Sequence, residues 1–240
     1  MTAAVATPAQ AGIASVAPEG NTQLFDGHDT RYLSLGYAEL LRDVTIDETW
    51  GITFLAGVVE RRSLAPREQA FMSVLVAMER GMQALLVRLL KKHGIAWDEA
   101  AIAAEADIVG RRLADRFGFL PWREFIQTAI ADPAPPYLSK YGRARELAPP
   151  ADHEILDLLV EHEQALLDVA ALELALMTDT ALAPVWRCLE KAQTLLWCEH
   201  IAELAGTTGE PADADAASAV TVLAGSPGAG SAATQEADHD

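Results

Sequence analysis

The lengths of the connections between predicted helices constrain this fold more than any other feature of the sequence. Apolar residues recur at helical spacing in four long segments, which predict helices at residues 31–62, 66–93, 152–177 and 184–204. Only a few residues separate the first helix from the second and the third from the fourth, so each pair should form an antiparallel hairpin. One long connection, residues 94–150, joins the hairpins. The pattern predicts a four-helix bundle with a single crossover.

Composition agrees with an all-α fold. Apolar residues make up 50% of the 240-residue chain, and alanine and leucine, which dominate them, are strong helix formers. Alternating runs of β-branched and aromatic residues, which are typical of strands, are scarce. We therefore expect one helical domain at residues 29–205. Its crossover should carry helices near 97–117 and 121–131 and end in a proline-rich connection.

The two ends of the chain differ from this domain in composition. Residues 1–28 are small and polar and are interrupted by Pro and Gly, and residues 206–240 carry acidic but no basic side chains. Such segments bury too little apolar surface to offset the entropy of folding. We expect a disordered N-terminal arm and a disordered acidic tail.

Charge and hydropathy limit the classes of partner that we expect for this protein. The formal net charge is −17, and phosphate-binding surfaces need clustered Lys and Arg, so we expect neither nucleic acid nor an anionic membrane as a partner. No uninterrupted apolar run approaches the roughly 20 residues that span a bilayer, and residues 1–20 lack the basic region of a secretory signal. Cys188 and Cys198 lie roughly 15 Å apart on one predicted helix, too far for a disulfide. These features predict a cytoplasmic protein.

The segment Leu158–Leu167, LLVEHEQALL, places three polar residues in a row within an apolar helix. Successive helical side chains point about 100° apart, so the three cannot share one face. The residues at helical spacing from His162 and Glu163 are apolar, whereas those around Glu161 are polar or charged. We expect His162 and Glu163 to face the core and Glu161 to face solvent.

Further polar residues are predicted at the same depth in the bundle. Glu48 and Glu79 stand at nearly equal distances in sequence from the turn of the first hairpin. Gln193 on the fourth helix matches His162 and Glu163 in the same way across the turn of the second hairpin. Because each helical residue adds about 1.5 Å, the five side chains should meet in one central layer.

Several carboxylates in one dry layer must be paired, coordinated to a cation or protonated, because an uncompensated buried ion is very costly. No inward Lys or Arg is predicted at this depth in the four helices. A pair of divalent metal ions is one solution, since carboxylate and imidazole bind iron, manganese and zinc. Shared protons and a bound substrate group are others. Glu48 and Glu79 can also reach solvent through an imperfect bundle, and His162 can be a hydrogen-bonded core residue.

With this topology, residues 31–205 resemble the ferritin-like superfamily, which includes ferritins, rubrerythrins and diiron carboxylate oxygenases. The resemblance also rests on the spacing of Glu48 and Glu79 and on the helix LLVEHEQALLDVAALELAL. It implies a ferritin-like four-helix bundle whose centre, two iron ions or manganese, activates oxygen or peroxide. The resemblance assigns the metal ligands to Glu48, Glu79, His162, Glu163 and Gln193.

The sequence departs from the ferritin-like pattern in its histidines. That pattern places Glu-x-x-His on two helices, but Met82 stands three residues after Glu79, and Leu196 stands three after Gln193. His162 has no Glu three residues before it. The reduced ligand set leaves open a dinuclear centre, a mononuclear centre or no metal.

Two functions of different kinds follow. The first is an oxidoreductase, a metal carboxylate oxygenase that acts on a small organic molecule held under the crossover and that draws on an electron-donor protein. The second is a metal-free ferritin-like subunit that serves in binding or assembly without catalysis. Iron storage is a third and weaker alternative, because long tails at both ends suit a storage cage poorly. A homodimer is compatible with each.

Overall fold

The computed structural model describes residues 30–207. The chain divides into two units, residues 1–199 and 200–240, and the description that follows concerns the first. Every regular element within the described range is helical, which confirms the predicted all-α class. The predicted arm at 1–28 lies outside the described residues, as does the predicted acidic tail beyond Thr207.

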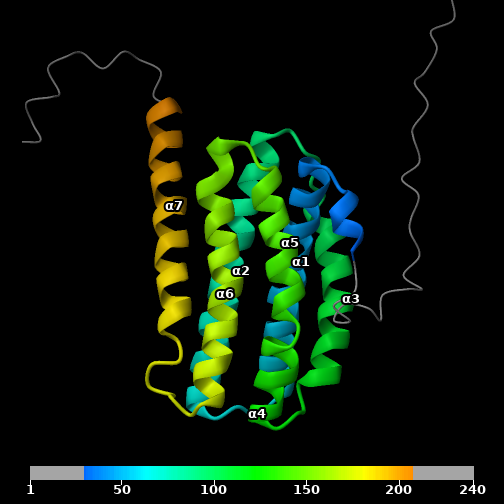
Figure 1. Cartoon of the computed structure of the whole chain (residues 1–240), viewed down its shortest axis with the longest axis vertical. Helices are drawn as coiled ribbons and strands as arrows, with labels where there is room; N and C mark the ends of the chain where they lie inside the picture. The colour runs from blue at the N-terminus through cyan, green and yellow to red at the C-terminus, as the bar shows by residue number, and fades with distance from the viewer. Residues whose placement is uncertain (1–29, 208–240) are drawn as a thin grey trace, which may run out of the picture. The chain divides into compact units, whose positions relative to one another are not determined.

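Nine helical elements of varied length follow η2, a 3-10 helix that opens the described range (Figure 1). In chain order the elements are η2 (Arg31–Ser34), α1 (Tyr37–Arg61), α2 (Pro66–Lys92), α3 (Glu99–Phe117), α4 (Trp122–Phe125), the π-helix η3 (Ile126–Ala131), α5 (Ala134–Leu147), the 3-10 helix η4 (Pro150–Asp152), α6 (His153–Leu174) and α7 (Ala183–Thr207).

The starts of α1 and α2 follow from local chemistry. The carboxylates of Glu39 and Glu68 accept hydrogen bonds from the backbone N–H groups of Gly36 (3.0 Å) and Ala65 (3.1 Å). These bonds satisfy N–H groups that have no partner inside the helix, and the negative charges oppose the positive end of the helix dipole. The short loop between Arg61 and Pro66 then lets α2 run back along α1, as the spacing predicts.

Helix α1 is central and packs against both α2 and α3. Its contact with α3 is close because glycine lies at the crossing. A Cβ atom on Gly110 would stand 2.6 Å from Cβ of Thr53 and 2.8 Å from the backbone nitrogen of Phe54. Any larger residue at Gly110 would push the helices apart, so this glycine fixes how tightly the crossover helix α3 covers α1.

Helix α5 is the main difference from the expected crossover. We expect a proline-rich connection there, whereas residues 134–147 form a helix that packs against α1 and α6. Pro135 and Pro136 lie in its first turn, where the N–H that proline lacks would have no intrahelical partner. Lys140 then ties α5 to α1 through Asp43 (2.5 Å) and Asp47 (2.7 Å).

Helix α7 does not complete the core as predicted. Its buried residues in the described part are few, namely Pro184, Val185, Cys188, Leu189 and Ala192. Trp186, Gln193 and Trp197 are exposed, and an ion pair from Lys191 to Glu161 links α7 to the outer face of α6. The predicted arrangement, two hairpins closing one four-helix core, is therefore not confirmed.

Helix α2 carries much of the core. By length and by a mean hydropathy of 1.4 in its most apolar window, it is a helix of the kind that can cross a membrane, and half of that window is buried inside the protein. Its fully buried side chains include Met72, Leu75, Met82, Leu86 and Leu90. These side chains pack against α1 and α6, which accounts for the apolar composition of the helix.

Candidate metal centre

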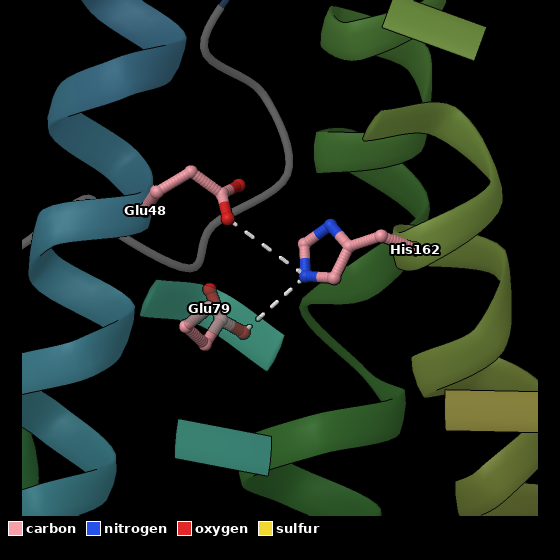
Figure 2. Close-up of side chains that lie close together, drawn as sticks. All are labelled: Glu48, Glu79 and His162. Atoms are coloured by element: carbon pink, nitrogen blue, oxygen red, sulfur yellow. Dashed lines mark hydrogen bonds and ion pairs between the residues drawn. The ribbon is translucent and has the colours of Figure 1, made fainter. Parts of the chain in front are cut away.

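Three helices that are far apart in sequence each direct one polar side chain to the same point in the core. Figure 2 shows Glu48 of α1, Glu79 of α2 and His162 of α6 converging there. Nε2 of His162 lies 3.4 Å from Oε1 of Glu79 and 3.8 Å from Oε2 of Glu48. One donor atom from each residue lies within 4.8 Å of the other two. The exposed fractions are 1% for Glu48, 6% for Glu79 and 1% for His162.

Helical periodicity brings these residues inward. Leu158 and Leu159, one turn before His162, are buried, as are Leu75 and Met82 around Glu79. The alternation of His162 and Glu163 inside with Glu161 outside is confirmed. The predicted depth of Glu48 and Glu79 is confirmed as well, because their carboxylates meet the same imidazole nitrogen.

A glycine makes room for one of the carboxylates. A Cβ atom on Gly51 would stand 2.9 Å from Oε2 of Glu79 and 3.2 Å from its Cδ. Gly51 lies one turn after Glu48 on α1, on the face that meets α2. The absence of a side chain at Gly51 therefore lets the Glu79 carboxylate lie against α1, within reach of the other two donors.

Polar atoms in this group lack hydrogen-bond partners. Both carboxylate oxygens of Glu48 and Nδ1 of His162 are buried without a hydrogen bond to any residue in the described range. An unpaired buried polar group costs about 1–3 kcal/mol, and more when it is charged. A metal ion with bonds of about 2.1 Å holds neighbouring ligand atoms about 3–4 Å apart, which is close to the separations around Nε2. Two carboxylates and one imidazole suit iron, manganese and zinc.

Burial also shifts the protonation of the carboxylates. It raises the pKa of Glu79 from 4.5 to about 7. Burial raises the pKa of Glu48 well above its ordinary range, and the imidazole of His162 opposes the shift. Without a cation, this group takes up protons at neutral pH. A divalent ion removes the need for them, since it supplies the missing positive charge.

Two of the five predicted ligands lie outside the three-residue group. Glu163 is buried next to it, and burial and the nearby charge of Glu79 raise its pKa well above the ordinary range. Gln193 is exposed on α7, so its predicted place in the central layer is wrong. The physical reason is that α5, not α7, covers this part of α1 and α6.

A cavity of about 80 Å³ adjoins the group. Glu48, Glu79 and Glu163 line it, together with Asp47 and the aromatic side chains Trp50, Phe54, Tyr137 and Tyr141. The rest of the lining is mainly aliphatic and comes from α1, α2, α3, η3, α5 and α6. π-Helices occur frequently at functional sites, and η3 contributes Ala129 and Ile130 to this wall.

Tyr137 and Tyr141 belong to the segment that the sequence predicts as a proline-rich connection. The structure puts them one turn apart on α5, in the wall of the cavity. Their i, i+4 spacing indicates one helix face, but that signal is useful only once the proline-rich segment is known to be helical. Asp47 and Lys140 give no signal of their own, because their pairing depends on the same helix.

No protein-family model, curated protein or solved structure matches this chain. The resemblance to the ferritin-like superfamily therefore stays a prediction, and the geometry of the site carries the functional conclusion alone.

Proposed function

We propose that Glu48, Glu79 and His162 bind one divalent transition-metal ion, iron or manganese, and that the protein is a metal-dependent oxidoreductase acting on a small organic molecule. The observation that carries the proposal is the convergence of three buried donor atoms, among which the Glu48 carboxylate has no hydrogen-bond partner in the described range. Two carboxylates balance the charge of one divalent ion. A buried ion of this kind satisfies the group better than protons do.

In this proposal, one set of side chains binds the ion and another set contacts the substrate. Glu48, Glu79 and Nε2 of His162 would hold the ion from three helices, beside the cavity that the two carboxylates line. Bound iron or manganese supplies one-electron redox chemistry toward oxygen or peroxide. Phe54, Leu55 and Leu75 line the cavity and provide an apolar surface for a carbon skeleton.

The ferritin-like bundle belongs to the same proposal. Its support is the pair of carboxylates at equal depth on the hairpin of α1 and α2, joined by a histidine from α6. The missing Glu-x-x-His pairs and the exposed Gln193 remove ligands that a second ion needs. We therefore propose a mononuclear centre instead of the dinuclear one that the resemblance implies.

Anaerobic titration with Fe(II), followed by desalting and metal analysis, tests the proposal. We expect about one iron per chain in the wild type, far less in Glu48→Ala, and the wild-type value in Glu161→Ala, which removes an exposed carboxylate near the same histidine. The absorption spectrum after admission of oxygen then reports whether the iron is oxidised. Iron that stays well below one equivalent in the wild type contradicts the proposal.

A metal-free binding or assembly subunit is the second candidate. The raised pKa values of Glu48, Glu79 and Glu163 favour it, because protons can neutralise these carboxylates without a metal. The two functions differ in one outcome. In the metal-free protein, Glu48→Gln leaves function intact, whereas in the oxidoreductase it removes both metal and activity.

A further inference from the structure

We propose that the cavity beside the metal group binds a short-chain primary amine, as its ammonium ion, with Glu163 as the counter-ion. The inference rests on the proposed metal centre, because it depends on the charge that is left when a divalent ion occupies that centre. It names the class of small molecule that the oxidoreductase takes.

The size of the cavity limits its occupant. A cavity of about 150 Å³ lined by apolar side chains binds benzene, and this one measures about 80 Å³. It therefore holds about three or four non-hydrogen atoms. The aliphatic and aromatic part of its wall suits a chain of carbon atoms, and the lining side chains that form this part include Phe54, Leu55, Leu75, Leu113, Ala129 and Ile130.

Glu163 gives the cavity one polar wall. Its side chain lines the cavity and is only 5% exposed. Throughout the described range it has neither a hydrogen bond nor an ion pair. A buried carboxylate of this kind is stable only with a partner, because it has lost its contacts with water. A partner can approach it from the cavity that it lines.

The other carboxylates of the cavity are already matched. Asp47 is paired with Nζ of Lys140 at 2.7 Å. In the proposed centre, Glu48 and Glu79 share the two charges of the metal ion. Glu163 is the remaining carboxyl group without a partner, and no Lys or Arg is among the residues that line the cavity. A positive charge placed beside this carboxyl group would favour its ionised form. A ligand with one positive charge and a short alkyl chain complements both the charge and the wall.

Three other ligand classes fit less well. A short alcohol offers the carboxylate a hydrogen bond without a charge, and a short carboxylic acid brings a second negative charge next to Glu163. A second metal ion needs several ligands, and Glu163 lies outside the group of donor atoms that converge within 4.8 Å. The ammonium group needs only one carboxylate, and Glu163 supplies it.

Isothermal titration calorimetry with the full chain loaded with Mn(II) tests the assignment. Propan-1-amine is the probe, and propan-1-ol and propanoate are its neutral and anionic counterparts of similar size. We expect the amine to bind at least tenfold more tightly than the alcohol, and propanoate to show no binding. Hexan-1-amine, which exceeds the cavity, should bind at least tenfold more weakly than propan-1-amine.

Two variants and one control locate the site. Glu163→Gln keeps the shape of the side chain and removes its charge, so it should weaken propan-1-amine binding at least tenfold and leave propan-1-ol unchanged. Glu161→Gln changes an exposed carboxylate two residues away and should affect neither ligand. Ala129→Leu fills the cavity from η3 and should weaken both ligands. This last variant keeps the test complete if Glu163→Gln does not fold.

Metal analysis of the same samples separates this proposal from the one on which it rests. Bound manganese together with equal affinity for amine and alcohol overturns the amine assignment and leaves the metal centre in place. Selective amine binding that depends on Glu163, in a protein without manganese, supports the amine site and contradicts the metal centre. A second equivalent of manganese that disappears in Glu163→Gln overturns the amine assignment, because it gives Glu163 a metal ion instead.

Discussion

The buried carboxylates at the ends of the helices differ from those at the centre in what surrounds them. Near the start of α6, Asp152 accepts hydrogen bonds from Tyr37 (2.7 Å) and Lys92 (2.6 Å) and contacts Nε2 of His93 at 2.5 Å. Burial alone raises its pKa, but the bonds from Lys92, Tyr37 and His93 outweigh burial and lower the pKa below 3.8.

The other end of α6 repeats this arrangement. Glu173 accepts a hydrogen bond from Arg67 at 2.7 Å and one from Nε1 of Trp122, also at 2.7 Å. The bonds from Arg67 lower the pKa of Glu173, against the opposing effect of burial.

At the centre, Glu48, Glu79 and Glu163 are buried to a similar degree, and their pKa values are raised. The end carboxylates have Lys or Arg partners, whereas among the described residues no Lys or Arg pairs with Glu48, Glu79 or Glu163. The end carboxylates therefore stabilise the fold, and the central ones are available to a ligand.

Among the substitutions that test this difference between end and central carboxylates, we expect the largest effect on stability at Asp152. Asp152→Ala removes a buried acceptor that Tyr37, Lys92 and His93 contact, and we expect it to lower the free energy of unfolding by about 3 kcal/mol or more. Denaturant unfolding measures the change. Asp157→Ala, which removes an exposed partner of Arg145, is the control and should cost far less. Equal losses of unfolding free energy in the two variants would show that the contacts of Asp152 stabilise the protein no more than an exposed ion pair does.

The second effect is on the pH dependence of stability in the metal-free protein. The pKa of Glu79 is raised from 4.5 to about 7, so its contribution to stability is complete below pH 4.5 and is lost as the pH rises through 7. We expect thermal unfolding midpoints to fall between pH 5 and pH 8, by an amount that corresponds to about 1–3 kcal/mol. Asp152 and Glu173, with lowered pKa values, should weaken the protein only in acid.

The Glu79→Gln variant identifies the source of that pH dependence. It should flatten the profile between pH 5 and pH 8 and leave the acid limb unchanged. A profile that stays the same in Glu79→Gln would falsify the assignment to this carboxylate.

A third and smaller effect is a gain in stability. Glu48→Gln replaces a buried carboxyl group whose oxygens make no hydrogen bond to a described residue. We expect the free energy of unfolding of the metal-free variant to be about 1 kcal/mol higher than that of the wild type. The same change at Glu173 should destabilise, because it breaks the bonds with Arg67. Chemical denaturation of both variants at pH 8 gives the two signs. A loss of stability in Glu48→Gln contradicts the contrast between centre and ends.

The smallest effect on stability is expected at Gly51. Gly51→Ala gains helix propensity of up to about 1 kcal/mol, but its Cβ forces the Glu79 carboxylate to shift. The net change in unfolding free energy should stay within about 0.5 kcal/mol, while Mn(II) affinity falls several-fold. Gly142→Ala is the matched control, since its Cβ meets no atom within 4 Å. Equal manganese affinity in both variants would show that Gly51 does not position Glu79.

The sequence predicts most of the site because helical geometry relates sequence distance to depth. Residue counts from the first turn place Glu48 and Glu79 together, and the apolar neighbours of His162 turn it inward. The same count fails for Gln193, because it assumes that α7 faces the core. Depth along a helix follows from the chain, but the choice of helix that covers a given face depends on packing between distant segments.

The proline-rich segment is a second region whose structure the sequence pattern did not predict. Pro135 and Pro136 predict an extended connection, yet proline is compatible with the first turn of a helix, and residues 134–147 continue as α5. The side chains that α5 adds to the cavity wall, Tyr137 and Tyr141, could therefore not be assigned from spacing alone. Their role depends on a tertiary contact between α5 and α1.

The three donor residues of the central group can come together only in a certain order during folding. His162 stands 83 residues after Glu79 in the chain, so their encounter closes a long loop, and contacts of this range form late and slowly. During synthesis, the hairpin of α1 and α2 emerges with two carboxylates but no imidazole. In the proposed metal centre, all three donors would be available only after α6 has left the ribosome and docked, so metal uptake would mark the completed fold.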